Sequence, residues 1–389
     1  MDKDFLPLVS AVALNALFGN EPKFSHYLID ALGSAEAVFA LSEKERRDLF
    51  GPYNGLADRI GPAALDAAAD ELERLSGRGY QFLDIFDDGY PAALRECPDA
   101  PLLLYVRSAT PARELFGKRP AVAVVGTRDQ SLYGRECCQR ILRALSEAPS
   151  KPLIVSGMAI GVDVTAHAAA LDGGLPTVGV SPVGIDEVYP RRHTAFAQRL
   201  CGTPGCALVT DYPPGTAPAP FTFLRRNRII AGLAGATVLV ESRIKGGGMI
   251  TARLAAGYGR DVFAVPGRLD DVRSQGCNLL IREQLAAPVT EPESLPAALG
   301  LGRLGRRRAA DLQTAVRERF GAALPPEETD RLARLAELVR ATRGICFDEL
   351  CRAADLPYAE VARGAGLLEE EGFIRIDVLQ RCTINAKNA

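Results

Sequence analysis

Short apolar runs alternate with helical stretches between residues 120 and 265, and this alternation constrains the fold more than any other feature. The runs are Val122–Val125, Pro152–Val155, Thr177–Val180, Ala207–Thr210, Thr237–Glu241 and Asp261–Val265. Strands that are separated by helices form parallel βαβ units with right-handed crossovers. We therefore predict an α/β fold with a doubly wound parallel sheet, to which the preceding segment Tyr90–Arg107 adds further strand material.

The regions on either side of this sheet have a different pattern. Residues 1–79 are predicted to form a helical domain, because "FLPLVSAVALNALFG" and "AALDAAADELERLSG" carry apolar residues at helical spacing and end at glycine. The sheet domain covers 80–299. Residues 300–326 are rich in Gly, Ala, Arg and Pro, which predicts a linker with room for one helix.

The last region, residues 327–389, is predicted to be a winged-helix-like domain. It contains three helical candidates, Asp330–Ala341, Phe347–Ala354 and Tyr358–Glu370, followed by a β-like ending. The region holds twelve acidic and nine basic residues. Because acidic helices repel phosphates, we expect a protein-docking or regulatory role for it, with weak DNA contact at most.

Composition and termini narrow the class of protein. The start of the chain lacks a basic segment followed by an apolar one, so we expect no signal peptide. No apolar run approaches the roughly 20 residues that span a bilayer, so we expect no membrane-spanning helix. The nine cysteines are scattered and odd in number, which favours reduced thiols, a cytoplasmic protein and no zinc site. A net charge of −2 argues against coating of long duplex DNA.

Two candidate anion-binding segments directly follow predicted strands. The carboxyl ends of parallel strands meet at one edge, where open α/β sheets bind ligands. In Gly126-Thr127-Arg128, the glycine permits close approach of a phosphate, the threonine offers a hydroxyl and the arginine a bidentate fork. Ser156-Gly157 offers backbone amides as a helix begins. A plain turn with a solvated arginine is the alternative for the first segment.

Three further segments add positive charge at the same edge. Tyr189-Pro190 is followed by two arginines, "FTFLRRNRIIAGL" interleaves arginines with phenylalanines, and a lysine and three glycines precede a helix. Cations that track a backbone and rings that stack on bases are typical of single-stranded nucleic acid sites. The candidate residues of these segments are Arg191, Arg192, Phe223, Arg225, Arg226, Asn227, Arg228, Lys245 and Gly247. A solvated charged face is the alternative for the arginine run.

A nucleotide-processing enzyme, resembling phosphoribohydrolases, is the competing function. Asp163 and His167 lie four residues apart on one helical face, but no serine or cysteine nucleophile motif accompanies them, so an oriented structural pair is the simpler interpretation. Glu241 is the carboxylate nearest the glycine-rich loop, and it stands at a strand end where it can accept hydrogen bonds from loop amides. The segment "FTFLRRNRIIAGL", with its arginines and phenylalanines, has no role in an enzyme that acts on small nucleotides.

Several motifs together resemble the DNA-processing protein A family (DprA, also called Smf). They are "YPAAL", "VAVVGTR", "VSGMAIGVDVTAHAAAL", "GIDEVYP", "FTFLRRNRIIAGL", "VLVESRIKGGGMITA" and "GRDVFAVPGRLDDVRSQGCNLLI", in family order. The resemblance implies an extended Rossmann-type domain between an N-terminal helical domain similar to SAM or helix-hairpin-helix units and a winged-helix-like domain. It also implies a cofactor-free, non-enzymatic protein that binds single-stranded DNA, forms homodimers and helps load the RecA recombinase during natural transformation.

The resemblance also assigns residues. Arg128 matches the arginine of the family's Gly-Ser/Thr-Arg turn, and Arg226, Asn227 and Arg228 match its Arg-Asn-Arg segment. The basic positions after Tyr-Pro correspond to Arg191 and Arg192. This chain departs from the pattern at Gly246-Gly247-Gly248, which stands where the family usually has Ser-Gly-Ser, so two hydroxyls are missing from that loop.

Overall fold

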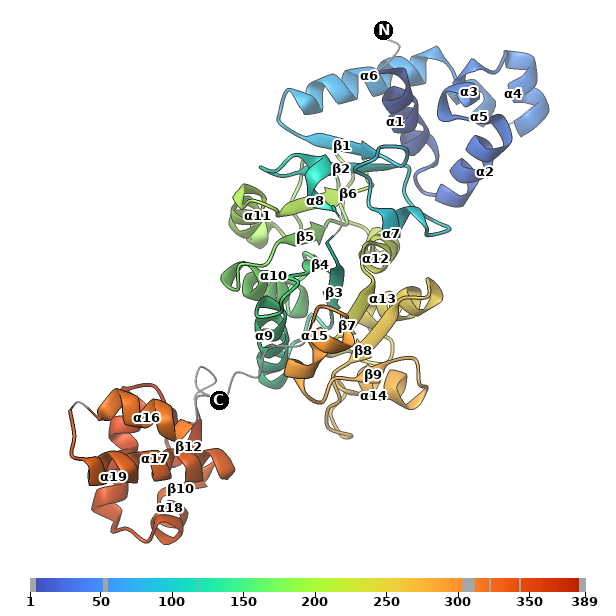
Figure 1. Ribbon diagram of the computed structural model, residues 1–389. Coiled ribbons are helices and arrows are strands. Elements are labelled where there is room, and N and C mark those ends of the chain that lie inside the picture. Colours follow the sequence, from blue (N-terminus) through green and yellow to red (C-terminus); the bar gives the residue numbers. More distant parts are fainter. Residues whose placement is uncertain are drawn as a thin grey trace. The chain divides into compact units, whose positions relative to one another are not determined.

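Nine strands form the predicted sheet, in the order β1-β2-β6-β5-β4-β3-β7-β8-β9 (Figure 1). They are β1 (Gln81–Asp84), β2 (Leu103–Arg107), β3 (Ala121–Val125), β4 (Leu153–Gly157), β5 (Thr177–Val180), β6 (Ala207–Thr210), β7 (Ala236–Leu239), β8 (Asp261–Ala264) and β9 (Ala287–Pro288). Strands β3 to β9 run parallel, whereas β1 and β2 extend the sheet antiparallel beyond β6. The α/β class and the added strand material are confirmed.

The structure is a computed structural model that describes residues 5–51, 55–117, 119–302, 312–321, 323–342 and 344–384. The chain divides into two units, residues 1–304 and 305–389. Within the part of the chain that is described, none of the helices has the length and apolar character that a membrane crossing requires.

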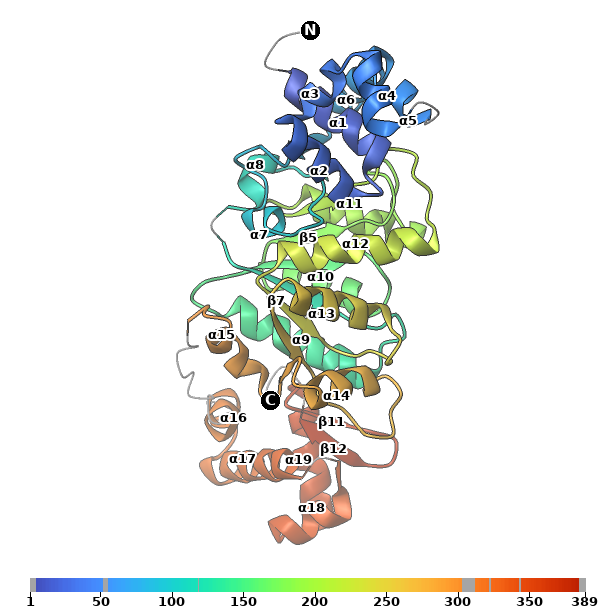
Figure 2. The ribbon, with the colours of Figure 1, turned by 90° about the vertical axis from the view of Figure 1, so that its right-hand side faces the viewer.

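Both faces of the sheet are covered, which explains why its strands are continuous apolar runs. On β3, Val122 and Val124 pack into one hydrophobic cluster, and Ala123 and Val125 pack into the other. Figure 2 shows α12 and α13 side by side along one face. The helices of this region are α7 (Ala92–Arg95), α8 (Ala112–Leu115), α9 (Leu132–Ser146), α10 (Val162–Asp172), η1 (Arg191–His193), α11 (Thr194–Gly202), α12 (Pro220–Leu233), α13 (Gly247–Gly257), α14 (Gln275–Arg282), η2 (Pro292–Ser294) and α15 (Leu295–Ala298).

The direction of winding reverses at β3. The chain passes from β3 through β4 and β5 to β6, and α12 then carries it back to β7 on the other side of β3. Crevices at such a reversal, outside the carboxyl ends of the strands, are where open α/β sheets bind ligands. The loops after β3, β4, β5 and β7 therefore surround one place.

Among the described residues, six helices precede the sheet and share its core. They are α1 (Leu6–Phe18), α2 (Pro22–Leu32), α3 (Ala35–Ala40), α4 (Glu43–Phe50), α5 (Gly55–Arg59) and α6 (Pro62–Ser76). Leu14 and Leu75 belong to the same hydrophobic cluster as Leu104 of β2. Asn15 donates a 2.8 Å hydrogen bond to the Asp211 carbonyl after β6. The helices expected at 1–79 are thus joined to the sheet in one unit.

The C-terminal unit combines helices with a small antiparallel sheet. Its elements are α16 (Leu312–Phe320), α17 (Pro326–Ala341), β10 (Ile345–Cys346), α18 (Phe347–Ala354), α19 (Tyr358–Glu370), β11 (Ile374–Ile376) and β12 (Arg381–Ile384). The segment 300–326, expected to be a linker with room for one helix, contains α16, which buries Leu312, Val316 and Phe320 in the core of this unit. Part of that segment, residues 303–311 and 322, lies outside the described residues.

Candidate nucleic-acid interface

A pocket of about 120 Å³ opens where the carboxyl ends of β3, β4 and β5 meet the first turns of α12. Its walls come from five segments between residues 128 and 226. The lining residues are Arg128, Met158, Ala159, Ile160, Pro182, Tyr189, Pro190, Arg192, Phe223 and Arg226. Three arginines thus surround a pocket whose other walls are apolar or aromatic.

Arg128 and two aromatic rings form one side of the pocket. The guanidinium carbon of exposed Arg128 lies 4.9 Å from the centroid of the Phe223 ring. Phe223 in turn contacts the Tyr189 ring edge-to-face, with centroids 5.2 Å apart. A cation over a ring face is attracted by the ring's quadrupole, so Phe223 holds the arginine beside the pocket.

The turn that carries Arg128 is held from two sides. The Thr127 amide donates a 2.7 Å hydrogen bond to the Glu241 carbonyl, and the Thr127 carbonyl accepts one of 3.2 Å from the Val162 amide. A Cβ on Gly126 would lie 2.6 Å from the Val162 side chain. A side chain at Gly126 would therefore collide with α10, so this position requires glycine for packing.

Ser156 and Gly157 do not face the pocket, which corrects the expectation for this segment. Ser156 is fully buried, and its hydroxyl donates a 2.6 Å hydrogen bond to the Val124 carbonyl. A Cβ on Gly157 would lie 2.1 Å from Nη1 of Arg226. Gly157 thus leaves space for that guanidinium, and the residues that line the pocket follow it at Met158, Ala159 and Ile160.

The arginines of α12 have three different environments. Arg226 is 4% exposed and lines the pocket, while its Nη1 donates a 2.5 Å hydrogen bond to the Val180 carbonyl. Burial lowers the pKa of Arg226, and the Asp163 carboxylate acts in the opposite direction. Arg225 donates to Asn20 and to the Gly19 carbonyl, so it ties α12 to the N-terminal helices.

Arg228 has a structural role, contrary to the expectation that it binds DNA. It is buried, forms an ion pair with Asp211 and donates to the Asp99 carbonyl. Asn227 donates a 3.5 Å hydrogen bond to the Gly247 carbonyl and so connects α12 to α13. Of the arginines in this segment, only Arg226 lines the pocket.

The remaining predicted residues lie on the exposed rim or beyond it. Arg191 and Arg192 are both exposed in η1, and Arg192 lines the pocket. Lys245 and Gly247 are exposed beside the N-terminus of α13, after the neighbouring strand β7, and do not line the pocket. They stand at the same edge of the sheet and extend its polar surface toward β7.

The residues that raised the enzyme alternative are engaged in structural contacts. His167 is fully buried, with Nδ1 2.7 Å from the Thr177 hydroxyl and Nε2 3.0 Å from the Gly157 carbonyl, so neither nitrogen bonds to Asp163. Burial lowers the pKa of His167 to about 4. Glu241 is 1% exposed and accepts hydrogen bonds of 3.0 and 2.5 Å from the Ser131 amide and hydroxyl.

Sequence reasoning missed several residues of this edge. Met158, Ile160 and Pro182 line the pocket, and their position directly after strands was the signal that could have found them. Asp129, next to Arg128, pairs with Arg273 at 3.2 Å and with Arg243 at 3.7 Å. Among the described residues, no cluster of histidine, cysteine and carboxylate side chains is suited to a metal ion.

Comparisons with known proteins give the family. The model of the DNA recombination-mediator protein A family matches residues 81–300. The DNA processing protein DprA of Streptococcus pneumoniae is 40% identical over 199 residues, which are 51% of this chain and 67% of that protein.

Two solved structures agree with this match. The crystal structure of DNA processing protein A from Streptococcus pneumoniae has a TM-score of 0.59 and 30% identity, and covers 74% of this chain and 95% of its own. DNA processing protein A of Helicobacter pylori, described for its single-stranded DNA binding mode, has a TM-score of 0.50, 28% identity and coverages of 57% and 95%. The relatives carry names of DNA-processing and DNA-binding proteins rather than of nucleotide-cleaving enzymes. The chain belongs to the DNA recombination-mediator protein A family.

Proposed function

We propose that this chain binds single-stranded DNA at the carboxyl edge of its sheet. The observation that carries the proposal is Arg128, held over the ring of Phe223 at a pocket that Arg192 and Arg226 also line. Exposed arginines bind backbone phosphates, and an aromatic wall accepts an unstacked base. Bases in a duplex are stacked and paired, so the same pocket disfavours double strands.

The charge arrangement supports a strand rather than a buried pyrophosphate as ligand. Arg128 and Arg192 come from loops after different strands and are exposed, so they offer cations spread along a path. Gly157 is buried against the side chains of Arg226 and Asp163, so its backbone offers no close approach of the kind that a dinucleotide needs. The carboxylate of Glu241 accepts hydrogen bonds from Ser131, so it is not available as the acid that a phosphoribohydrolase would use.

Fluorescence anisotropy of a labelled single strand and its duplex, at several salt concentrations, tests the proposal. We expect tighter binding of the single strand. Arg128→Ala and Arg192→Ala each weaken it and reduce the magnitude of the salt slope by about 0.7 per lost phosphate contact. Lys151→Ala is the matched control, because Lys151 is exposed at the opposite end of β4. Equal behaviour of all three variants would contradict the site.

Further parts of the proposal follow from the family resemblance. We infer that the chain acts in the cytoplasm as a homodimer that protects incoming DNA and helps load the RecA recombinase in natural transformation. Nucleation of RecA on a single strand then accelerates with the wild-type protein and not with Arg128→Ala. Sedimentation of the full chain tests the dimer, and a monomer at all concentrations would exclude it.

For the C-terminal unit we propose a docking or regulatory role, as a winged-helix-like module that does not read DNA. The one basic residue on α19, Arg363, pairs with Glu328 at 2.8 Å, and Glu360 of the same helix pairs with Arg331. The helix therefore offers phosphates no unpaired cation among its described residues. Removal of residues 305–389 is expected to leave single-strand and duplex affinity unchanged.

A further inference from the structure

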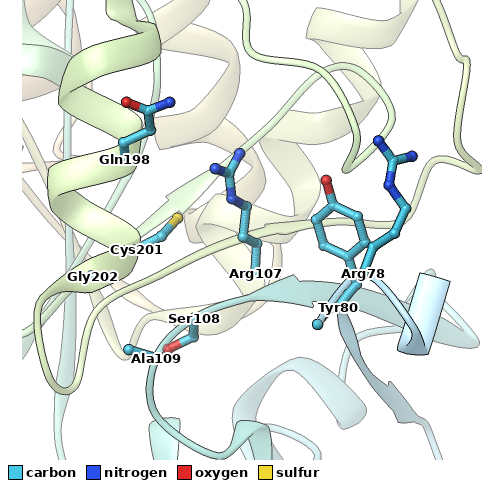
Figure 3. A pocket seen from close by; sticks show the side chains of 9 residues that line it. Arg78, Tyr80, Arg107, Ser108, Ala109, Gln198, Cys201 and Gly202 are labelled. Atoms are coloured by element: carbon cyan, nitrogen blue, oxygen red, sulfur yellow. The ribbon is translucent and has the colours of Figure 1, made fainter.

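A second pocket, of about 330 Å³, lies at the other edge of the sheet. Arg107 ends β2 and pairs in register with Leu208 near the start of β6, which places it at the amino ends of the parallel strands. The other walls come from the turn between α6 and β1 and from the end of α11 (Figure 3). The lining residues are Arg78, Gly79, Tyr80, Arg107, Ser108, Ala109, Gln198, Cys201 and Gly202.

The lining is positively charged. It contains two arginines, a tyrosine and a glutamine, and no acidic residue. In Figure 3 the side chains of Arg78, Tyr80 and Arg107 extend in the same direction, and Gln198 of α11 lies beyond the Arg107 guanidinium. Within the described part of the chain, the guanidinium groups of Arg78 and Arg107 have no hydrogen-bond or ion-pair partner, although those of most arginines of this unit do.

Strand pairing and hydrogen bonds fix the backbone around Arg107. It is the last residue of a paired strand, and the Ser108 hydroxyl that follows donates a 2.7 Å hydrogen bond to the Cys206 carbonyl. The same hydroxyl oxygen accepts a 2.9 Å hydrogen bond from the Thr110 amide. The guanidinium of Arg107 is partly buried, so it loses some of its hydration without gaining an ion pair in return. An anion in the pocket would offset that loss.

The thiol of Cys201, which lines this pocket, is not an activated nucleophile. Burial raises the pKa of Cys201, and the positive charge of Arg107 acts in the opposite direction without reversing the shift. A protonated thiol is a poor nucleophile, so Cys201 forms a wall. The pocket is therefore suited to binding an anion and not to reacting with it.

We propose that this pocket binds the phosphate group of a nucleotide, independently of the site at the carboxyl edge. Two guanidinium groups offer planar forks that match phosphate oxygens. Gln198 adds an amide, and the ring of Tyr80 provides a flat face for the attached nucleoside. The phosphate belongs either to a free mononucleotide or to a nucleic acid strand; the strand case rests on the proposed function.

Calorimetric titration of the full chain with dAMP tests the first source. The titration uses the Arg128→Ala background, which weakens the carboxyl-edge site, with and without Arg107→Ala. We expect Arg107→Ala to weaken dAMP binding about tenfold or more, as for a lost hydrogen-bonded charge. Lys151→Ala removes one charge from the same edge outside the pocket, and we expect it to leave the affinity unchanged. Arg78→Ala, in an exposed turn, repeats the test if Arg107→Ala fails to fold.

Anisotropy with a long single strand tests the second source in the otherwise wild-type chain. If the strand is the ligand, dAMP does not bind, and Arg107→Ala lowers the magnitude of the salt slope by about 0.7 relative to Lys151→Ala. Variants of Arg107 and Arg78 that match Lys151→Ala with both probes would overturn the proposal, as would a chain that binds neither probe. Binding of dAMP without strand binding would contradict the proposed function alone and support this one.

Discussion

The guanidinium of Arg128 lies over the ring of Phe223, with 4.9 Å between the guanidinium carbon and the ring centroid. Arg128 follows β3 and Phe223 lies in the first turn of α12, so the contact joins the turn to the helix that returns the chain to β7. The same ring contacts Tyr189. Phe223 therefore both orients the exposed cation and forms an aromatic wall of the pocket.

Phe223→Ala is expected to weaken single-strand binding by about 1–3 kcal/mol, the usual loss for one base-stacking ring. Phe221→Ala is the matched control, because Phe221 is exposed on the same turn and does not line the pocket. Anisotropy titrations of both variants, with thermal melts to confirm folding, measure the difference. Equal losses would show that Phe223 makes no specific contact with DNA.

Arg228→Ala is expected to destabilise the protein rather than its DNA complex. The change leaves the carboxylate of Asp211 buried without its ion-pair partner, at a cost of about 3–5 kcal/mol. Arg225→Ala removes bonds from a more exposed arginine, and we expect a loss of about 1 kcal/mol. Urea unfolding of the two variants and of the wild-type chain measures these losses in the free energy of unfolding. A stable Arg228→Ala protein with weakened DNA binding would instead place Arg228 in the interface.

Of two glycines of the predicted site, one is expected to lose stability on substitution by alanine and the other to tolerate it. A Cβ on Gly157 would lie 2.1 Å from Arg226 and 2.5 Å from Asp163, and both of these side chains are buried. Gly157→Ala therefore displaces Arg226 and lowers stability. At Gly247 the space around the Cβ is open, so Gly247→Ala keeps the free energy of unfolding within about 1 kcal/mol of wild type. Denaturation midpoints distinguish the two, and equal midpoints would refute the packing role of Gly157.

The buried His167 is expected to make stability depend on pH in the acid range. Its pKa is lowered to about 4 in the folded protein, against an ordinary value near 6.5 in the unfolded chain. The unfolded chain therefore binds the proton first, and stability is lost as pH falls from about 6.5 to about 4. The loss is about 3 kcal/mol, from a shift of about 2.5 pKa units.

Urea unfolding at a series of pH values measures this effect. The comparison is between the wild-type chain and His167→Gln, which keeps a polar side chain at this position but does not titrate. The difference in free energy of unfolding should shrink steadily below pH 6.5. Parallel pH profiles for the two proteins would mean that His167 does not titrate differently in the folded and unfolded states.

The sheet was predictable because its strands are buried on both faces. β5 (Thr177–Val180) and β6 (Ala207–Thr210) have the bounds that the apolar runs predicted. The buried hydroxyls of Thr177 and Thr210 donate hydrogen bonds to backbone carbonyls, so these polar residues fit within the strands. In the C-terminal unit, α18 and α19 likewise have the predicted bounds. The core position of α16 was missed although Leu312, Val316 and Phe320 recur every four residues, because the run of glycines and arginines before the helix made the whole segment resemble a linker.

The candidate site was predictable as a place but not residue by residue. Strand ends identify the edge of the sheet, and Arg128 lies there as expected. Arg226 and Arg228 are two positions apart on one helix, and the sequence alone does not tell them apart. One lines the pocket and the other forms an ion pair with Asp211, because two positions along a helix point to different neighbours.

The amino-acid sequence by itself determined the elements, their parallel arrangement and the edge that carries positive charge. These properties depend on local periodicity and on the rule that parallel strands end at one side. Only the tertiary structure decided which polar groups remain available to a ligand. Ser156 and Glu241 are engaged by backbone and side-chain partners far away in the chain, whereas Arg128 and Arg192 remain exposed. Availability depends on long-range packing, which local sequence patterns do not encode.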